Sequence, residues 1–113
     1  IVSLDNAVAN HIRVFLDARI PAGSVQVFIK TDDLEGGFDD NVWTQLYTTQ
    51  GGVEVAVPSQ NPNYSSYEFK PLSASGLSPY SRYQIKILTE TPSEITDLET
   101  TIIKDLRAVP ISK

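Results

Sequence analysis

Alternation of apolar and polar residues recurs along this chain and constrains its fold more than any other feature. Side chains of a β-strand point to opposite faces in turn, so a segment with this period buries one face and exposes the other. The pattern is clearest in residues 12–19, 25–30, 53–57, 83–88 and 102–107. It predicts an all-β fold built from short strands.

Turn-forming residues separate these segments. Pro21 and Gly23 predict a turn that joins residues 12–19 and 25–30 as an antiparallel pair, and Gly51-Gly52 predicts a second turn. Polar segments predict loops at residues 31–41, 59–66 and 71–79, and only residues 92–97 could form a turn of helix. Short strands with loops of irregular length predict an antiparallel β-sandwich of about seven or eight strands, with Greek-key or jelly-roll-like connections.

The chain has 113 residues, of which 41% are hydrophobic, and this suits one domain with one core. We therefore expect a single β-sandwich domain over residues 1–113. The chain begins at Ile1 rather than Met, has nothing like a signal peptide, and ends just after a predicted strand. We expect it to be a domain excised from a longer protein.

Composition excludes several classes of function. The sequence has no cysteine, which excludes a disulfide scaffold, a thiolate zinc site and a cysteine nucleophile. A net charge of −5 and scattered basic residues argue against binding to nucleic acid. No apolar run approaches the roughly 20 residues of a membrane span. We expect neither a nucleic-acid partner, nor a membrane, nor a cofactor.

Catalytic patterns are weak. His11 is the only histidine, and the chain has no Gly-x-Ser-x-Gly turn to accompany it as the base of a triad. Two carboxylates could serve glycoside hydrolysis, but most acids fall in one predicted loop, which is poor catalytic geometry. We therefore predict that the domain is not an enzyme.

The acidic loop at residues 31–41 is a candidate calcium site. Calcium prefers carboxylate oxygens, and Gly36-Gly37 would let the backbone fold around an ion. The spacing is not that of an EF-hand, and a solvated hairpin loop explains the same residues. The candidate ligands are Asp32, Asp33, Glu35, Asp39 and Asp40.

Aromatic residues suggest a second kind of site. Tyr64 and Tyr80 lie in predicted loops, so we expect them to be exposed contact residues, as on a sugar-binding platform. Trp43, Phe69 and Tyr83 lie in alternating segments, and core packing explains them more simply. A carbohydrate- or receptor-binding module is therefore an alternative function.

Several segments, in the same order, resemble a domain of large virion structural proteins of contractile-tailed phages, especially marine myoviruses. The segment IRVFLDARIPAG, running into VQVFIK, is similar to an "Arg-Val-aromatic-Leu…Ala…Pro" strand and the strand that follows it. FDDNVW resembles an acidic "Phe-Asp-Asp…Trp" element, and YEFKP a "Tyr-Glu-Phe-Arg-Pro" strand. The series is completed by YQIKI and IKDLRAV, so the matches span residues 12–30, 38–43, 67–71, 83–87 and 103–109.

This resemblance implies a non-enzymatic structural domain in a phage virion, in the tail, baseplate or a fibre. Such a domain acts in assembly through contacts with other virion subunits, as a homo-oligomer within the particle. Asp105 and Arg107, from the last matching segment, share one strand face. They pair across strands, face a partner subunit or form a solvated surface feature, and the sequence leaves these alternatives open.

Overall fold

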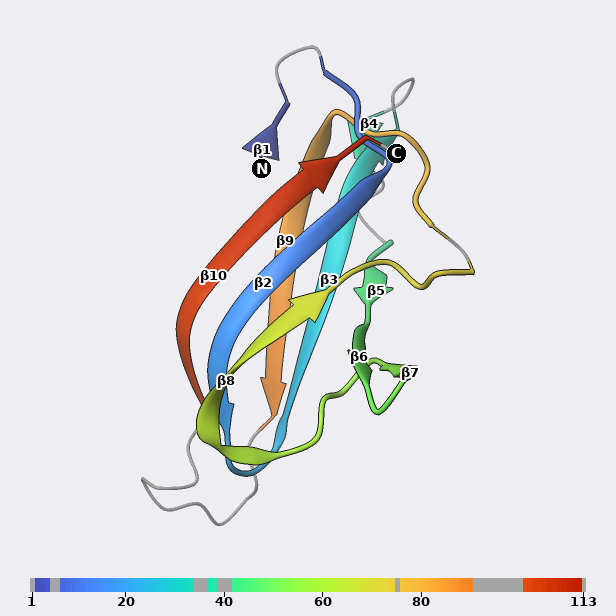
Figure 1. Cartoon of the computed structure of the whole chain (residues 1–113). Helices are drawn as coiled ribbons and strands as arrows, with labels where there is room; N and C mark the ends of the chain where they lie inside the picture. The colour runs from blue at the N-terminus through green and yellow to red at the C-terminus, as the bar shows by residue number, and fades with distance from the viewer. Residues whose placement is uncertain are drawn as a thin grey trace.

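The computed structural model describes residues 2–4, 7–33, 37–38, 42–74, 76–90 and 101–112. All regular secondary structure in these residues is β-strand, and every strand pairing is antiparallel (Figure 1). The predicted all-β, sandwich-like fold is therefore confirmed. Among the described residues there is no helix that could cross a membrane. Residues 92–97, the one predicted turn of helix, lie outside them.

Two sheets form the body of the molecule. In the first, β1 (Val2–Ser3), β9 (Arg82–Glu90), β3 (Ser24–Asp33) and β4 (Gly37–Phe38) follow in that order, and β5 (Thr44–Leu46) also pairs with β3. In the second, β2 (His11–Ile20) lies between β10 (Ile102–Ile111) and β8 (Asn61–Phe69). A small hairpin of β6 (Thr48–Gln50) and β7 (Val53–Val55) stands beside β8 (Figure 1).

The core lies between the two sheets, where the inward faces of β2, β3, β8 and β9 meet. Period-two alternation explains its composition, because the apolar member of each pair along β2 and β3 points inward. The buried apolar residues are Ala9, Ile12, Val14, Leu16, Ala18, Ile20, Val25, Val27, Ile29, Leu46, Tyr67, Phe69, Tyr80 and Tyr83.

The turn at Pro21–Gly23 joins the two sheets rather than two neighbouring strands. The predicted pairing of residues 12–19 with 25–30 is therefore wrong: β2 pairs with β8 and β10, and β3 pairs with β9, β4 and β5. Gly23 adopts a φ of 79°, which favours glycine. Turn residues signal that the chain reverses, but a reversal within one sheet and a reversal between stacked sheets use the same residues.

The Gly51-Gly52 turn is confirmed. Both glycines have positive φ, 60° and 79°, and Gln50 pairs with Val53 across them. A two-residue loop with positive φ at both positions matches the right-handed twist of the strands that it joins.

Two predicted loops contain strand. The segment 59–66 was predicted as a loop because it is polar and holds Pro62, but β8 begins at Asn61. The predicted loop 31–41 includes the end of β3 and the short strand β4. β8 and β4 are edge strands, and such strands tolerate polar residues and proline because one side of the backbone is not paired within the sheet.

Candidate functional site

One long side of the sandwich is incompletely closed. The pairs β2–β8 and β3–β9 match strands B–E and C–F of the immunoglobulin scheme, in which the last strand G lies beside F. Here the last strand, β10, pairs instead with β2, in the other sheet. On its outer side β9 therefore meets only β1, which pairs with Tyr83 and Arg82. Among the described residues, the outer backbone edge of residues 84–90 is left unpaired.

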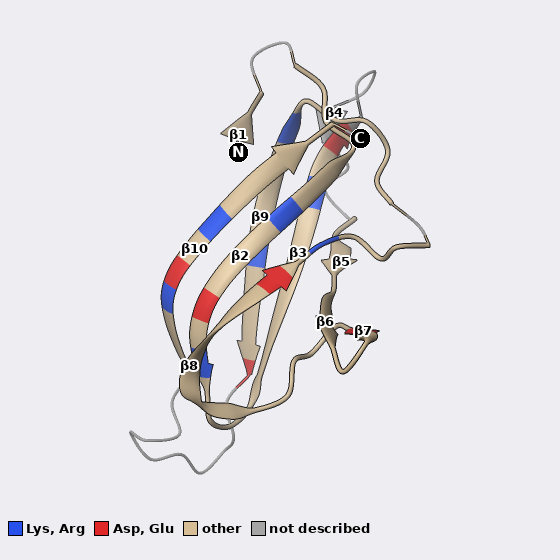
Figure 2. Cartoon of the chain, viewed as in Figure 1, with Lys and Arg blue, Asp and Glu red and all other residues tan. Residues whose placement is uncertain are grey.

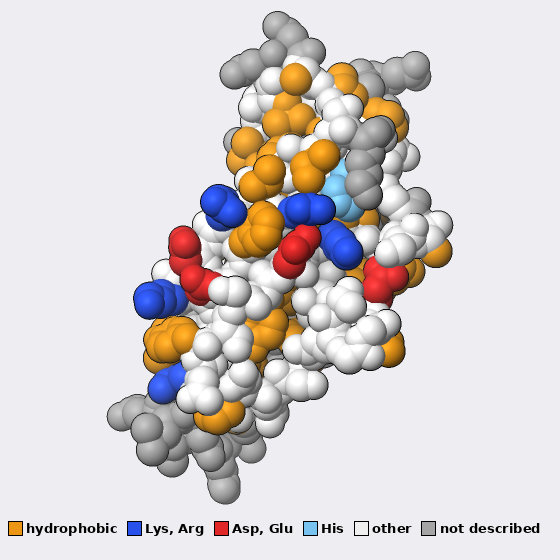
Figure 3. Space-filling view, viewed as in Figure 1, with side chains coloured by type: hydrophobic (Ala, Val, Ile, Leu, Met, Phe, Trp, Pro, Cys, Tyr) orange, Lys and Arg blue, Asp and Glu red, His pale blue; other side chains and the backbone are white. Residues whose placement is uncertain are grey.

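An apolar crevice of about 480 Å³ lies on this open side, between β1 and β9 of one sheet and β10 of the other. Val2, Tyr83, Ile85, Leu106 and Ala108 line it, and around the β9 edge it also reaches Gln84 and Trp43. Leu106 is 44% exposed and Val2 47%. Orange hydrophobic side chains gather at the end of the molecule where β1 and the end of β10 lie (Figure 3). Exposed apolar side chains around a common hollow are typical of a contact surface.

The edges of β9 and β10 differ in how readily they could accept a further strand. Three features of β10 oppose the addition of a strand. Its pairing with β2 shifts register between Ile103 and Asp105, and Pro110 has no N–H. The backbone N–H of Leu106 donates to its neighbour Asp105 Oδ1 at 2.9 Å. A bulge, charged residues and proline are the features that keep edge strands from pairing. β9, in contrast, pairs with β3 without a register shift. The charged Lys86 of β9 lies over the sheet face, with its ammonium 4.6 Å from the Trp43 ring centroid, and so does not block the edge.

A second hollow of about 460 Å³ lies between β8 and the β6–β7 hairpin. Eight of its eleven lining residues are Ser, Thr, Asn or Gln, and Glu68 and Lys70 are charged. We call this hollow the polar groove. At one end, Tyr47 and Lys70 exchange two backbone hydrogen bonds of 2.8 and 2.9 Å, and beyond this bridge β6 and β8 are not paired with each other. In Figure 3 the region over β8 and the hairpin is mostly white, the colour of uncharged polar side chains and backbone.

Trp43 lies on the outer face of the first sheet and not in the core, where we predicted it. The Lys30 and Lys86 ammonium groups lie 4.8 and 4.6 Å from its ring centroid, and Lys86 also lies 4.7 Å from the Phe28 centroid. These distances are those of cation–π contacts. Phe69 and Tyr83 are in the core, as predicted.

Charged residues occur along β2, β8 and β10 of the second sheet (Figure 2). Arg13 Nε lies 3.3 Å from Glu68 Oε1, and both side chains are largely exposed, so the pair adds little stability. Asp105 and Arg107 do share one strand face, since Asp105 lies opposite Asp17 and Arg107 lies opposite Phe15. The Arg107 guanidinium lies 4.8 Å from the Phe15 ring centroid.

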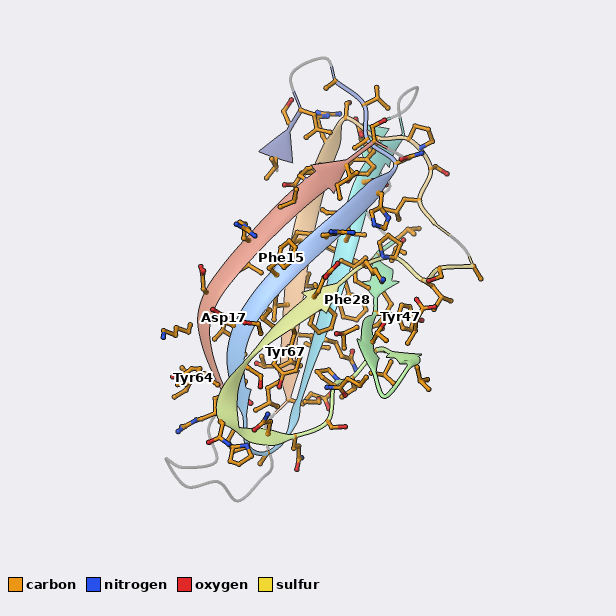
Figure 4. All side chains as sticks on the ribbon, viewed as in Figure 1. Phe15, Asp17, Phe28, Tyr47, Tyr64 and Tyr67 are labelled. Carbon is orange, nitrogen blue, oxygen red and sulfur yellow. The ribbon has the colours of Figure 1, made fainter. Side chains whose placement is uncertain are left out.

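The two predicted contact tyrosines have different environments. Tyr64 is 50% exposed at the start of β8 and points away from the core, with Lys104 Nζ 5.5 Å from its ring centroid (Figure 4). Tyr80 is 0% exposed, so its predicted exposure is wrong. Residues 78–80 approach β9 as irregular backbone, which the sequence indicated, but Ala9 and Tyr80 form a bridge that turns the ring into the core.

Asp32 is a structural residue of the first sheet. It is buried near the end of β3, where its carboxylate accepts hydrogen bonds from the backbone and side chains of Ser81 and Arg82 at 3.0–3.3 Å. Burial alone would raise the pKa of this carboxyl, but these hydrogen bonds outweigh burial and lower it below 3.8.

The calcium hypothesis stays a prediction. Glu35, Asp39 and Asp40 lie outside the described residues, and of Asp33 only the backbone is described. The part of the chain that is described holds no group of three or more acidic, histidine or cysteine side chains suited to a metal ion. His11 is buried at the start of β2, beside a small hollow near Pro71 and Leu77.

The polar groove and the apolar crevice were both missed by sequence reasoning. Each is formed by strands far apart in the chain, and alternation does not say which strands become edges. A signal for the groove was present in the run of hydroxyl and amide residues at 59–66. The exposed Leu106 of β10 gave no such signal, because an apolar residue in an alternating strand is expected to face a core.

Together, the fold and these surfaces define an antiparallel β-sandwich with one open apolar side and one polar groove. Comparison of the chain with protein-family models, with curated proteins and with solved structures gives no match.

Proposed function

We propose that this chain is a non-enzymatic structural domain of a phage virion protein, in the tail, baseplate or a fibre, and that it acts in assembly through subunit contacts. The resemblance of its sequence segments to contractile-tailed phage proteins supports the virion part of this proposal. The apolar crevice between β9 and β10 is the observation that supports assembly.

The unpaired edge of β9 makes the kind of contact more specific. An extended segment of a neighbouring subunit would add to the sheet beside residues 84–90, through main-chain hydrogen bonds. Its alternate side chains would enter the crevice between Ile85 and Leu106. Burial of this apolar surface would stabilise the contact by about 25 cal/mol per Å² before the costs of association.

β10 is not the pairing edge in this proposal. Its bulge, the hydrogen bond that Asp105 makes to the Leu106 N–H, and Pro110 all oppose the addition of a strand. The neighbouring subunit would therefore touch β10 through side chains such as Leu106, and pair its backbone with β9.

Incorporation of a crevice variant into particles tests the proposal. Leu106→Lys places a charge at the crevice, and we expect the folded variant to be lost from purified particles that incorporate the wild-type chain. Val53→Lys is the matched control, because Val53 is 60% exposed on the β6–β7 hairpin, away from the crevice. Normal incorporation of Leu106→Lys would contradict assembly through this side.

A further inference from the structure

We infer that the polar groove between β8 and the β6–β7 hairpin is a binding site for a neutral oligosaccharide. This site is separate from the apolar crevice, since the two share no lining residue. The groove volume of about 460 Å³ falls within the range of ~300–1,000 Å³ that ligand pockets span.

The chemistry of the walls favours a ligand with many hydroxyl groups. Thr48, Thr49 and Gln50 come from the hairpin, and Gln60, Asn61 and Ser65 come from the facing segment. Hydroxyl and amide side chains both donate and accept hydrogen bonds, as sugar hydroxyls do. A wall of this kind suits neither an apolar ligand, which needs apolar surface, nor a strongly charged one, which needs opposite charge.

The charged residues at the groove balance one another. Glu68 and Lys70 contribute one negative and one positive side chain to the lining, and Glu68 also pairs with Arg13 on the outer face. Among the lining residues that the structure describes, the formal charges therefore cancel, and they select neither an anion nor a cation. The lining therefore favours a neutral saccharide over ligands that carry phosphate or acidic groups.

Several amides of the groove are already held in place. Gln50 Oε1 accepts from the Ser59 backbone N–H at 2.8 Å, which ties the hairpin to the start of the facing wall. Asn61 accepts from the Asn63 N–H at 2.9 Å and donates to Ser65 Oγ at 3.0 Å. These bonds fix the directions of the Gln50 and Asn61 amides. Side chains fixed before binding lose less conformational entropy when a ligand arrives.

An extended peptide is the competing occupant, because the outer edge of β8 forms one side of the groove. Peptides that add a strand are held by main-chain bonds and by pockets for alternate side chains. The described lining residues form no apolar pocket for such side chains: the one large aromatic residue among them, Tyr67, is buried. The lining therefore favours a saccharide over a peptide strand.

NMR titration of the whole 113-residue chain with gluco-, galacto- and mannohexaose, at millimolar concentrations, tests the inference. We expect at least one of these neutral oligosaccharides to shift backbone amide signals of residues 48–50 and 59–66 in a saturable manner. The crevice residues 84–88 and 106–108 should not respond. A hexagalacturonate and an uncharged hexapeptide serve as the anionic and peptide probes.

Two variants and one control locate the site. Thr49→Ala and Gln60→Ala each remove a polar group from an exposed groove residue, and each should weaken saccharide binding by about tenfold, as loss of one or two hydrogen bonds does. Thr89→Ala is the matched control, because Thr89 is exposed on β9 and outside the groove. All three should keep the wild-type spectrum elsewhere, which shows that the fold is intact.

The inference is overturned if none of the three oligosaccharides shifts the groove signals, or if their shifts map to another surface. It is also overturned if only the peptide or only the anionic probe binds there. Each of these results leaves the assembly proposal untouched, since that proposal depends on the crevice.

Discussion

Leu106 lies directly opposite Leu16 in the antiparallel ladder of β10 and β2, yet Leu16 is 1% exposed and Leu106 is 44% exposed. Two leucines at the same level of one sheet thus have different environments. The sheet of β10 and β2 extends beyond the part of the core that the first sheet covers, because in the described part of the chain β9 has only the two residues of β1 on its outer side. This difference is the structural basis of the proposed contact surface.

Truncation of these two leucines should have different consequences. Leu16→Ala removes a fully packed side chain and should lower the free energy of unfolding by about 2–5 kcal/mol. Leu106→Ala should lower it by less than about 1 kcal/mol, because the side chain is already in contact with water. Chemical denaturation of the isolated chain measures both values. Equal losses would mean that Leu106 is covered within the chain itself, which contradicts an open side.

The Asp32 carboxylate should make stability depend on acid pH. Its pKa is lowered below 3.8 in the folded chain, so its contribution is present above that pH and is lost as the pH falls through the folded pKa. Asp32→Asn should lower the free energy of unfolding near neutral pH by about 1.5–3 kcal/mol, the usual range for hydrogen bonds to a charged group. The difference from wild type should shrink below about pH 4.

Asp105→Asn is the control for this measurement. Asp105 is exposed and accepts one hydrogen bond, from the adjacent Leu106 N–H. Its replacement should change stability by less than about 0.5 kcal/mol. A similar loss in both variants, or an Asp32→Asn effect that does not depend on pH, would show that the bonds from Ser81 and Arg82 do not stabilise the charged form.

The Tyr80 hydroxyl should make stability depend on alkaline pH. It donates to the backbone carbonyl oxygen of His11 at 2.8 Å, and burial, with a smaller contribution from Tyr83, raises the pKa of Tyr80 well above 10.0. The stability linked to this protonated phenol is fully present below pH 10.0 and is lost as the pH rises through the folded pKa. Tyr80→Phe should cost about 1–3 kcal/mol at neutral pH, because the carbonyl loses its partner.

Denaturation at a series of pH values compares Tyr80→Phe with wild type. The gap between them should narrow above about pH 10, whereas Tyr64→Phe, which changes an exposed residue, should match wild type throughout. A constant gap would mean that deprotonation of Tyr80 does not limit stability at high pH.

The turn of the β6–β7 hairpin depends on glycine. Gly52 has a φ of 79° and nothing within 4 Å of an added Cβ, so Gly52→Ala brings backbone strain without a clash. It should cost about 1–2 kcal/mol, and Gly52→Asn should cost less, because asparagine tolerates this conformation better. Amide hydrogen exchange should quicken in residues 48–55 and stay unchanged in β2. Equal effects of alanine and asparagine would exclude strain as the cause.

The sequence predicted most strands because their faces differ. In β2, β3 and β9 one face packs on the core and the other meets solvent, so their alternation is strong. At the edges this contrast disappears: β8 begins in a polar segment that holds Pro62, and β10 exposes Ile103 and Leu106 on the face that they share with the buried Ala18 and Leu16. The sequence therefore predicted a loop for the first and a strand for the second, and alternation did not show that the inward side of that strand is exposed.

The candidate sites were harder to predict because they depend on which strands become neighbours. Tyr80 and Tyr64 both lie in polar surroundings in the sequence, but only the bridge between Ala9 and Tyr80 turns one ring inward. In the same way, the crevice exists because β10 pairs with β2 and not with β9. Pairings between residues so far apart leave no local trace in the sequence.

A cryo-EM map of the assembled particle that carries this chain tests the central claim most directly. We predict an extended segment of a neighbouring subunit hydrogen-bonded along residues 84–90 of β9, with an apolar side chain between Ile85 and Leu106. A map in which the domain hangs free, with the β9 edge and the crevice open to solvent, would contradict assembly through this side.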